Sequence, residues 1–333
     1  RFHRLSRPRE RSDRPLRPEY QVTARTASVA PRPARQDAFA SVTCTSHPAR
    51  LTTATFRMFG SLEKYKVFGL GRSTSSLLPK ENQFKIDLTN KPEIESLNFI
   101  PDIVIHTAAL TDLSLCEREP ELANRVHVEA SKTLARIGGK RTKFFYLSTD
   151  SVFDGKKGNY TEKDIPNPLN VYASSKLKGE IEVQNVLGDS AIILRTNIYG
   201  FHQPMQNSMV EWAYREWMLG KTISGFTDTI FNAVFTYQLA EIIEFMIDEE
   251  IVFPIINIGS DEAISKFDFL EKLRKELKIE RALLTPALSA TFTSPIKRPK
   301  DTSLNTTLLS TFYSVPDFES GIKDWMTNFS VRN

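Results

Sequence analysis

The sequence has few cysteines, few histidines and no long hydrophobic run, and each shortage argues against a class of protein. Its two cysteines, Cys44 and Cys116, lie far apart and form no Cys-x-x-Cys pair, which disfavours a disulfide framework and a zinc site. The five histidines show no metal-ligand spacing. No uncharged apolar stretch approaches the roughly 18 residues of a membrane-spanning helix. We therefore expect no metal, no membrane contact and a reducing, cytoplasmic compartment.

The net charge of +4 is spread unevenly along the chain. Residues 1–57 contain twelve arginines, no lysine and four acidic residues, a net charge of +8, so residues 58–333 carry −4. The larger part of the chain therefore lacks the basic excess that nucleic-acid binding requires. We predict no nucleic-acid partner.

Residues 1–57 also differ from the rest in composition. They hold six prolines and show no sustained hydrophobic periodicity, which favours disorder. An Arg-rich, acid-poor segment is also typical of a mitochondrial or plastid transit peptide, although early prolines oppose the amphipathic helix that such a peptide needs. The rest of the chain uses 21 Lys and 11 Arg, and so abrupt a change is what a misassembled gene start would leave. We predict a disordered or non-native leader over 1–57.

From about residue 64 apolar strands alternate with helices. This alternation predicts parallel pairing and a doubly wound α/β sheet. We expect a core over 58–200 and, over 201–333, a smaller lobe that mainly faces the substrate and partly returns to the core. The expected strands are 65–71, 84–88, 101–109, 143–150, 191–200 and 253–259, and the expected helices are 120–138, 170–186, 206–219, 236–248, 265–277 and one from about 316.

Tyr172 and Lys176 lie four residues apart at the start of a predicted helix, hence on one face. The pair alone is a weak signal, because an exposed Tyr and Lys at this spacing are common. About 23 residues upstream, however, Thr149 follows a buried strand, and ligands of open α/β sheets gather at the carboxyl ends of strands. Tyr172 would exchange a proton with a carbonyl or alcohol, Thr149 would bind the same oxygen, and Lys176 would lower the pKa of the phenol and hold a ribose hydroxyl.

The stretch "STDSVFDG…YTEKDIPNPLNVYASSKLKGE" resembles the extended short-chain dehydrogenase/reductases and, within them, the dTDP-4-dehydrorhamnose reductase group. A cousin of that group is the non-catalytic regulatory β subunit of methionine adenosyltransferase. The resemblance runs from about residue 64 to 330. It implies a Rossmann-like fold in which Thr149, Tyr172 and Lys176 are the catalytic triad and Ser148 and Asp150 lie against the substrate.

The resemblance also implies a cofactor site for NADP(H), with NAD as the alternative. "FGLGRS" places Arg72 at the 2′-phosphate, which a guanidinium can bind bidentately, although a solvated surface arginine is the simpler reading. "IDLTN" would pack on adenine, and the small residues of "HTAALT" would lie beneath the nicotinamide ribose. The residues implied at the cofactor are Arg72, Asp87, Leu88, Ala108, Ala109, Thr111, Tyr172 and Lys176, and Arg298 of "RPKDTSL" is implied at a substrate diphosphate.

Several positions depart from the family pattern. Ser151 stands where the family's dehydratases carry a glutamate base, which favours simple carbonyl reduction. The reductases usually have tyrosine there, so the substrate stays open. His127 occupies the position of a common helix asparagine, and Ala173 that of a glycine. Neither change removes a reacting group.

The largest departure from the family pattern is at the N-terminal side of the fold. There the family has a strand, a Gly-x-x-Gly-x-x-Gly turn and a helix, which together hold the pyrophosphate of the dinucleotide cofactor. Nothing in residues 1–63 matches that turn. A strand at 52–60 would leave too few residues before the strand at 65–71, because a parallel crossover needs at least about 10–12. We therefore predict that the first βα unit is missing, that 57–66 is the tail of the first helix, and that stability and NADP binding are both weak.

The sequence as a whole predicts an NAD(P)H-dependent reductase of a keto group on a nucleotide-linked 4-keto sugar. The alternative is a non-catalytic, NADP-binding regulatory subunit, and other reactions of the extended family, such as epimerisation, stay open. The expected partners are a nucleotide sugar, a second copy of the chain in a homodimer, or a regulated enzyme.

Overall fold

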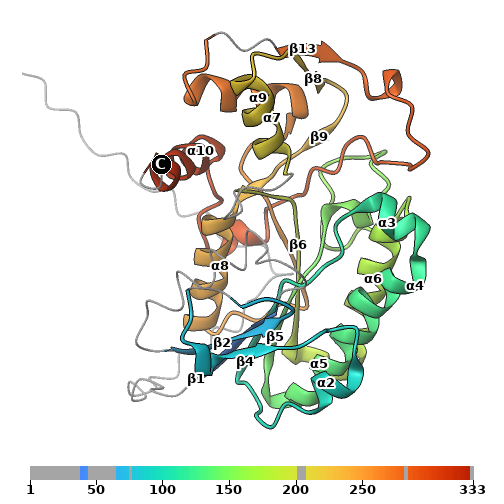
Figure 1. The fold of residues 1–333 in the computed structure, drawn as a ribbon, viewed down its shortest axis with the longest axis vertical. Coiled ribbons are helices and arrows are strands. Elements are labelled where there is room, and N and C mark those ends of the chain that lie inside the picture. Colours follow the sequence, from blue (N-terminus) through green and yellow to red (C-terminus); the bar gives the residue numbers. More distant parts are fainter. Residues whose placement is uncertain (1–37, 44–64, 75–76, 201–207, 281–283, 331–333) are drawn as a thin grey trace, which may run out of the picture. The chain divides into compact units, whose positions relative to one another are not determined.

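The computed structural model of this protein describes residues 38–43, 65–74, 77–200, 208–280 and 284–330, which lie in one compact unit. Its centre is a seven-stranded sheet in the order β11-β6-β5-β4-β1-β2-β3, with every neighbouring pair parallel (Figure 1). The predicted Rossmann-like, doubly wound sheet is therefore confirmed. The strands are β1 (Ala38–Thr43), β2 (Tyr65–Gly71), β3 (Gln83–Lys85), β4 (Ile103–His106), β5 (Lys143–Leu147), β6 (Ala191–Thr196) and β11 (Ile255–Ile258).

Strand β1 lies in the middle of the sheet, where Ala40 pairs with Val67 of β2 on one side and with Ile103 of β4 on the other. This corrects the prediction that the first strand is missing, and with it the expectation of a gap that weakens the sheet. The leader predicted over 1–57 was also wrong over 38–43. The reason lies in the sequence "AFASVT", which lacks the continuous large apolar run expected of a strand buried on both faces.

Twenty-one residues, 44–64, join β1 to β2, which is enough for a parallel crossover. They lie outside the described residues, as does most of the helix tail predicted over 57–66. The phosphate-binding turn of the family would fall in the same connection, and its only glycine is Gly60. The prediction of weak NADP binding therefore rests only on the low glycine content of residues 44–64.

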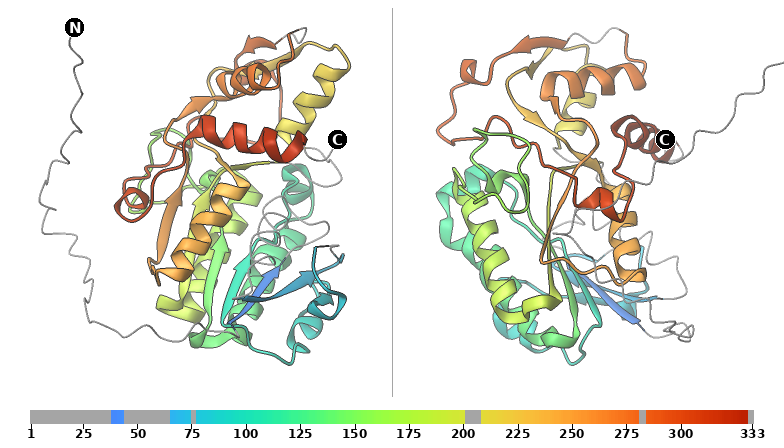
Figure 2. Two further views of the ribbon diagram at one scale, coloured as in Figure 1. Left: turned by 90° about the vertical axis from the view of Figure 1, so that its left-hand side faces the viewer. Right: turned by 180° about the vertical axis from the view of Figure 1, so that it is seen from behind.

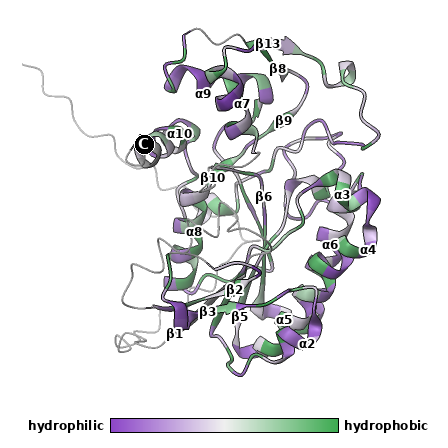
Figure 3. Cartoon of the chain, viewed as in Figure 1, coloured by the Kyte–Doolittle hydropathy of each residue, from purple (hydrophilic) through white to green (hydrophobic). Residues whose placement is uncertain are grey.

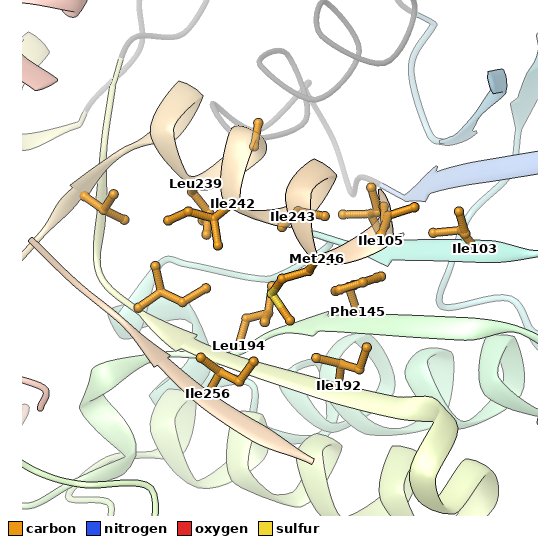
Figure 4. Packing of buried hydrophobic residues seen from close by; sticks show 14 of the residues in the cluster. Ile103, Ile105, Phe145, Ile192, Leu194, Leu239, Ile242, Ile243, Met246 and Ile256 are labelled. Carbon is orange, nitrogen blue, oxygen red and sulfur yellow. The ribbon is translucent and has the colours of Figure 1, made fainter. Parts of the chain in front are cut away.

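Helices cover both faces of the sheet (Figures 1 and 2). α8 (Thr236–Asp248) packs on one face, and α5 (Ala130–Gly138) and α6 (Val171–Leu187) pack on the other. Successive strand residues point to opposite faces, so Ile105 meets the α8 side and Val104 the α5 and α6 side. Figure 4 shows the α8 layer, in which Leu239, Ile242, Ile243 and Met246 pack on Ile103, Ile105, Phe145, Ile192, Leu194 and Ile256.

Shorter helices follow β3 and β4. Hydrophobic and hydrophilic residues alternate along the covering helices (Figure 3), as expected for helices with one face on a core. The predicted helix 120–138 is divided by a π-helical turn in its middle, in which the amide of Ala130 donates to the carbonyl of Arg125. The elements are α2 (Lys91–Glu95), α3 (Leu113–Arg118), α4 (Pro120–Asn124) and the π-helical turn Arg125–Glu129.

Residues beyond 208 divide between the sheet and a second layer. α8 and β11 join the central sheet, whereas most other elements share a separate hydrophobic cluster around Trp217, Phe269 and Phe318. The assignment of 58–200 to the cofactor and of 201–333 to the substrate stays a prediction. The elements outside the sheet are β7 (Ile198–Tyr199), α7 (Met209–Met218), β8 (Ile223–Phe226), β9 (Ile230–Phe231), β10 (Val234–Phe235), β12 (Ile264–Ser265), α9 (Lys266–Glu276), β13 (Leu284–Ala287) and α10 (Phe318–Ser330).

Among the described residues, no helix combines the length and the apolar character that crossing a membrane requires.

Gly179 allows α6 to lie directly on its neighbours. A Cβ at this position would be 2.2 Å from the Tyr146 hydroxyl and 2.3 Å from the His127 carbonyl oxygen. We expect Gly179→Ala to lower the free energy of unfolding by about 1–3 kcal/mol through overpacking, despite the better helix propensity of alanine. Urea denaturation measures this, with the exposed neighbour Lys178→Ala as the control, which should stay within about 0.5 kcal/mol. A midpoint for Gly179→Ala at or above that of the parent would contradict the close packing.

Candidate active site

The three residues of the predicted triad line one cavity of about 1050 Å³, at the end of the sheet where β4, β5 and β6 finish. Thr149 follows β5, whereas Tyr172 and Lys176 belong to the first turns of α6. This is the end of an open α/β sheet at which ligands bind. Ser148, Asp150, Ala109, Thr111 and Arg298 line the same cavity.

Asn170 fixes where α6 begins. Its side chain accepts a hydrogen bond of 2.9 Å from the amide of Ala173, which makes it the helix N-cap. Its amide group also donates to the carbonyl of Lys297 over 3.1 Å. The start of the helix, and with it Tyr172, is therefore tied to the segment that carries Arg298.

Thr149 and Tyr172 line the same cavity and lie close enough for the Thr149 hydroxyl to stabilise the Tyr172 phenolate, so both can reach one substrate oxygen. The pKa of Tyr172 is raised to about 12: burial is the main cause, the charge of Asp150 adds to it, and the neighbouring Thr149 hydroxyl opposes the rise. The phenol therefore keeps its proton at neutral pH and can donate it. This differs from the expectation that Lys176 lowers the pKa of the phenol, because burial is the larger influence.

Lys176 is buried and faces the sheet. Its Nζ donates to the carbonyl of Leu147 over 2.6 Å and lies 4.1 Å from the centre of the Tyr146 ring. Burial lowers the pKa of Lys176 to about 7, although the carboxylate of Glu180 acts in the opposite direction. Near neutral pH this lysine is thus divided between its charged and neutral forms.

This depressed pKa predicts a pH-dependent stability. Because Lys176 titrates near 7 in the folded protein and at 10.5 when unfolded, the unfolded chain binds the extra proton between these values, and stability should rise with pH across that window. We expect Lys176→Met to be more stable than the parent at pH 7, by up to about 4 kcal/mol. The gain should shrink as pH rises to 10.5. Urea unfolding across that range measures it, and a gain that does not change with pH would contradict the buried charge.

Ser148 lines the cavity, but its hydroxyl donates to the carboxylate of Glu180. Glu180 in turn accepts three hydrogen bonds from Arg195, of which the shortest, 2.7 Å, comes from Nη2. All three side chains are buried. Ser148 therefore links the cavity wall to this ion pair, and its role at the substrate stays a prediction.

Asp150 links several of the segments that line the cavity. One carboxylate oxygen accepts from Asn197 over 2.8 Å and from Thr302 over 2.5 Å. The other accepts from the hydroxyls of Thr149 and Ser151, each over 3.2 Å. Asp150 therefore joins the ends of β5 and β6 to the segment after Arg298, and it positions Thr149. The sequence carried no signal for Asn197, and Thr302 entered only as part of the stretch "RPKDTSL". Both reach this carboxylate through the fold.

His127, in the π-helical turn, joins three parts of the site. Its Nε2 accepts from the amide of Leu110 over 2.8 Å, so Nδ1 carries the proton and donates to Ser175 over 2.7 Å. Ser175 donates to the carbonyl of Tyr172. Burial lowers the pKa of His127 well below its usual value, so the ring stays neutral. The signal in the sequence was its place at the position of the family asparagine.

The predicted cofactor residues fall into two groups. Ala109 and Thr111 line the cavity beside Tyr172 and Lys176, and Ala108 is buried beneath. Small side chains at the end of β4 leave room for a ring and a ribose over the phenol, which fits the nicotinamide half of a dinucleotide.

The second group lies near the ends of β2 and β3, outside the residues that line this cavity. Burial acts to raise the pKa of Asp87, but hydrogen bonds from Thr89 and the positive charges of Arg72 and Arg125 lower it overall. Arg72 and Asp87 are thus close together, whereas the Leu88 side chain is buried in the core. Their roles at the cofactor stay predictions.

The family model described as RmlD substrate binding domain matches residues 60–331. A probable low-salt glycan biosynthesis reductase of Haloferax volcanii is 30% identical over 227 residues, which cover 66% of this chain and 75% of that protein. The dTDP-4-dehydrorhamnose reductase of Aggregatibacter actinomycetemcomitans is 27% identical over 277 residues, covering 77% and 94%. The methionine adenosyltransferase 2 subunit beta of Bos taurus is 36% identical over 134 residues, 40% of each chain.

Among solved structures, the dTDP-4-dehydrorhamnose reductase of Bacillus anthracis in complex with NADP superposes with a TM-score of 0.75. The match covers 86% of this chain and 99% of that one, at 23% identity. At this identity the likeness concerns the fold.

Proposed function

The chain belongs to the RmlD substrate-binding-domain family, and on that premise we propose that it reduces a keto group of a nucleotide-linked 4-keto sugar with NADPH. The observation that carries the proposal is that Thr149 and Tyr172 lie together beside the buried Lys176, in a cavity large enough for a nucleotide sugar. Relatives named as dTDP-4-dehydrorhamnose reductases support this class of substrate.

When bound, NADPH supplies a hydride to the keto carbon. The residues of this chain supply the proton and hold the oxygen. Tyr172 gives its phenolic proton to the carbonyl oxygen, which becomes the alcohol, while the Thr149 hydroxyl donates a hydrogen bond to the same oxygen. A phenol with a pKa of about 12 is still more acidic than an alcohol, so the transfer runs downhill.

Lys176 and Asp150 both influence this proton transfer. Asp150 raises the pKa of Tyr172, which keeps the phenol protonated, and it accepts the Thr149 proton over 3.2 Å until a substrate oxygen takes its place. Lys176, one helical turn from Tyr172, would supply positive charge as the phenolate forms and would bind a ribose hydroxyl. Ala109 and Thr111 would line the seat of the nicotinamide ribose, with Ala108 beneath, and Arg72, Asp87 and Leu88 the seat of the adenosine, where NAD is the alternative.

The direct test is the loss of NADPH absorbance when the purified protein meets a dTDP-linked 4-keto sugar. We expect turnover with NADPH, and slower turnover with NADH. The absence of NADPH oxidation with dTDP- and UDP-linked 4-keto sugars would contradict the proposed activity.

A second function is favoured by one observation. Identity to the methionine adenosyltransferase 2 subunit beta is higher than to the reductases, 36% over 134 residues, although this match covers only 40% of that protein. A non-catalytic, NADP-binding regulatory subunit would form a stable complex with a catalytic methionine adenosyltransferase chain and would leave NADPH unconsumed. Co-expression followed by size-exclusion chromatography separates the two proposals.

A further inference from the structure

Glu180 is a buried carboxylate on α6, one helical turn beyond Lys176, and it does not line the cavity. Tyr172, Lys176 and Glu180 follow one another at intervals of four residues, so they lie along one side of the helix. A phenol, an ammonium and a carboxylate thus form one row. The phenol and the ammonium line the cavity, whereas the carboxylate lies behind them in the core.

Lys176 and Glu180 bind consecutive residues at the end of β5. The ammonium of Lys176 donates to the carbonyl of Leu147 over 2.6 Å, and the hydroxyl of Ser148 donates to the carboxylate of Glu180. The amide of Ser148 donates in turn to the carbonyl of Leu194 in β6 over 2.8 Å. The two side chains are therefore held to adjacent points of the sheet, so the backbone limits how far apart their charges can move.

Most titratable groups around the Lys176 ammonium are uncharged in the described part of the chain. Burial raises the pKa of two phenols and lowers the pKa of two imidazoles, so four side chains are neutral near pH 7: Tyr146, Tyr172, His106 and His127. On the cavity side, Asp150 already accepts from four donors and acts on Tyr172. The negative charge that favours the protonated lysine is that of Glu180.

Arg195 and Ser148 stabilise the charge of Glu180 in the core. Between them they donate hydrogen bonds to both oxygens of its carboxylate, and such bonds favour the ionised form of a buried acid. All of these side chains are buried, and charges act on each other more strongly where water is excluded. Glu180 is therefore placed to act on Lys176 with little screening.

We propose that Glu180 is a positioning residue of the proton-transfer group, whose carboxylate keeps Lys176 charged when Tyr172 gives its proton to the substrate. The O–H bond of Tyr172 breaks in this step and the proton goes to the substrate oxygen, while Lys176 keeps all of its protons beside the phenolate. The inference rests on the proposed reduction, which supplies the role of Tyr172. Arg195 and Ser148 act through Glu180.

The charge of Lys176 can be measured without turnover, from the ¹³Cε resonance of the full chain labelled with ¹³C-lysine and assigned by its loss in Lys176→Met. We expect the pKa of Lys176, about 7 in the parent, to be lower by about 1 or more in Glu180→Gln. The matched control is Glu182→Gln. Glu182 lies on the same helix but pairs with Lys132 over 2.6 Å at a partly exposed site, so its loss should not change that pKa.

The pH dependence of kcat gives the second measurement. Lys176 is charged below its pKa, so kcat should fall as the pH rises through that value. In Glu180→Gln this fall should move to lower pH by the same amount as the pKa, whereas a residue that only supports the fold would lower kcat equally at every pH. Arg195→Met breaks the same ion pair but keeps the carboxylate, so its fall should not move to lower pH.

Should Glu180→Gln fail to fold, the double variant Glu180→Leu with Arg195→Met replaces it, because no charge of the pair stays buried. It should also lower the pKa of Lys176, since the carboxylate is lost. An unchanged pKa, or an equal decrease in Arg195→Met, would overturn the inference. If the pKa depends on Glu180 but no 4-keto sugar is reduced, the link between the charges stands and the proposed reaction fails. If turnover occurs with one pH profile in the parent and in Glu180→Gln, the reaction stands and the role of Glu180 fails.

Discussion

Tyr172→Phe should lower kcat for NADPH-dependent keto reduction by about 10²–10⁴-fold, the usual contribution of a positioned acid. The substitution removes one hydroxyl and keeps the ring that packs edge-on against His127 at 5.6 Å. The proton donor is lost, whereas the shape of the cavity is kept. KM should therefore change little, because the lost interaction acts mainly in the transition state.

Steady-state kinetics of Tyr172→Phe and of Tyr313→Phe measure this effect. Tyr313 packs against Phe245, does not line the cavity and should tolerate the change. Since the pKa of Tyr172 is about 12, loss of its proton should not limit the rate of the parent until the pH nears that value. A Tyr172→Phe variant that keeps more than about a tenth of the parental kcat would rule out the phenol as the acid.

Glu180→Gln is expected to lower the free energy of unfolding by about 3–5 kcal/mol, the largest stability effect that we predict. Glu180 is the buried counter-charge of Arg195, whose side chain is 3% exposed. Nη1 of Arg195 already lacks a hydrogen-bond partner in the described part of the chain. Glutamine keeps the volume but leaves the guanidinium without a compensating charge. It also removes the group that supports the protonated form of Lys176.

Chemical denaturation compares this variant with Glu95→Gln. Glu95 pairs with Lys91 over 3.5 Å, but both side chains are more than half exposed, so its loss should cost no more than about 0.5 kcal/mol. The double variant Glu180→Leu with Arg195→Met should recover much of the stability, since no charge stays buried. A loss below about 1 kcal/mol in Glu180→Gln would show that another group compensates Arg195.

The bounds of several elements were predicted closely. The strand expected at 65–71 is β2, and the helix expected at 236–248 is α8, residue for residue. Both carry strong local signals: a short apolar stretch in β2, from Val67 to Leu70 with only Gly69 between, and a regular apolar face in α8. The strand expected at 84–88 is the shorter β3, Gln83–Lys85. The amide of Ile86 still donates to the carbonyl of Gly71 in β2, and a turn closed by the bond from the Asn90 amide to the Asp87 carbonyl follows before α2.

β1 shows where local signals fail. "AFASVT" contains only Phe39 and Val42 as large apolar residues, yet it pairs with β2 and β4 along its length. Its position is decided by β2 and β4, whose facing edges would otherwise keep unpaired backbone N–H and C=O groups. Pairing of this kind cannot be read from a six-residue segment alone.

The residues of the candidate site also divide into those that the sequence indicated and those that only the fold brings together. Tyr172 and Lys176 share a helix, and Thr149 follows a strand, so their order along the chain was enough to suggest a common role. Asn197 comes from a distant segment and reaches the carboxylate of Asp150 only through the fold. A lone asparagine just after a strand has no functional signal in sequence.

The sequence by itself determined the alternating strands and helices, the faces that they bury and the spacing of the proton-transfer group, because these depend on residues close together in the chain. The tertiary structure alone decided the strand at the centre of the sheet, the pKa of Tyr172 and the charges of the cavity wall. Those depend on burial and on contacts between distant segments, and electrostatic interactions change strongly once water is excluded.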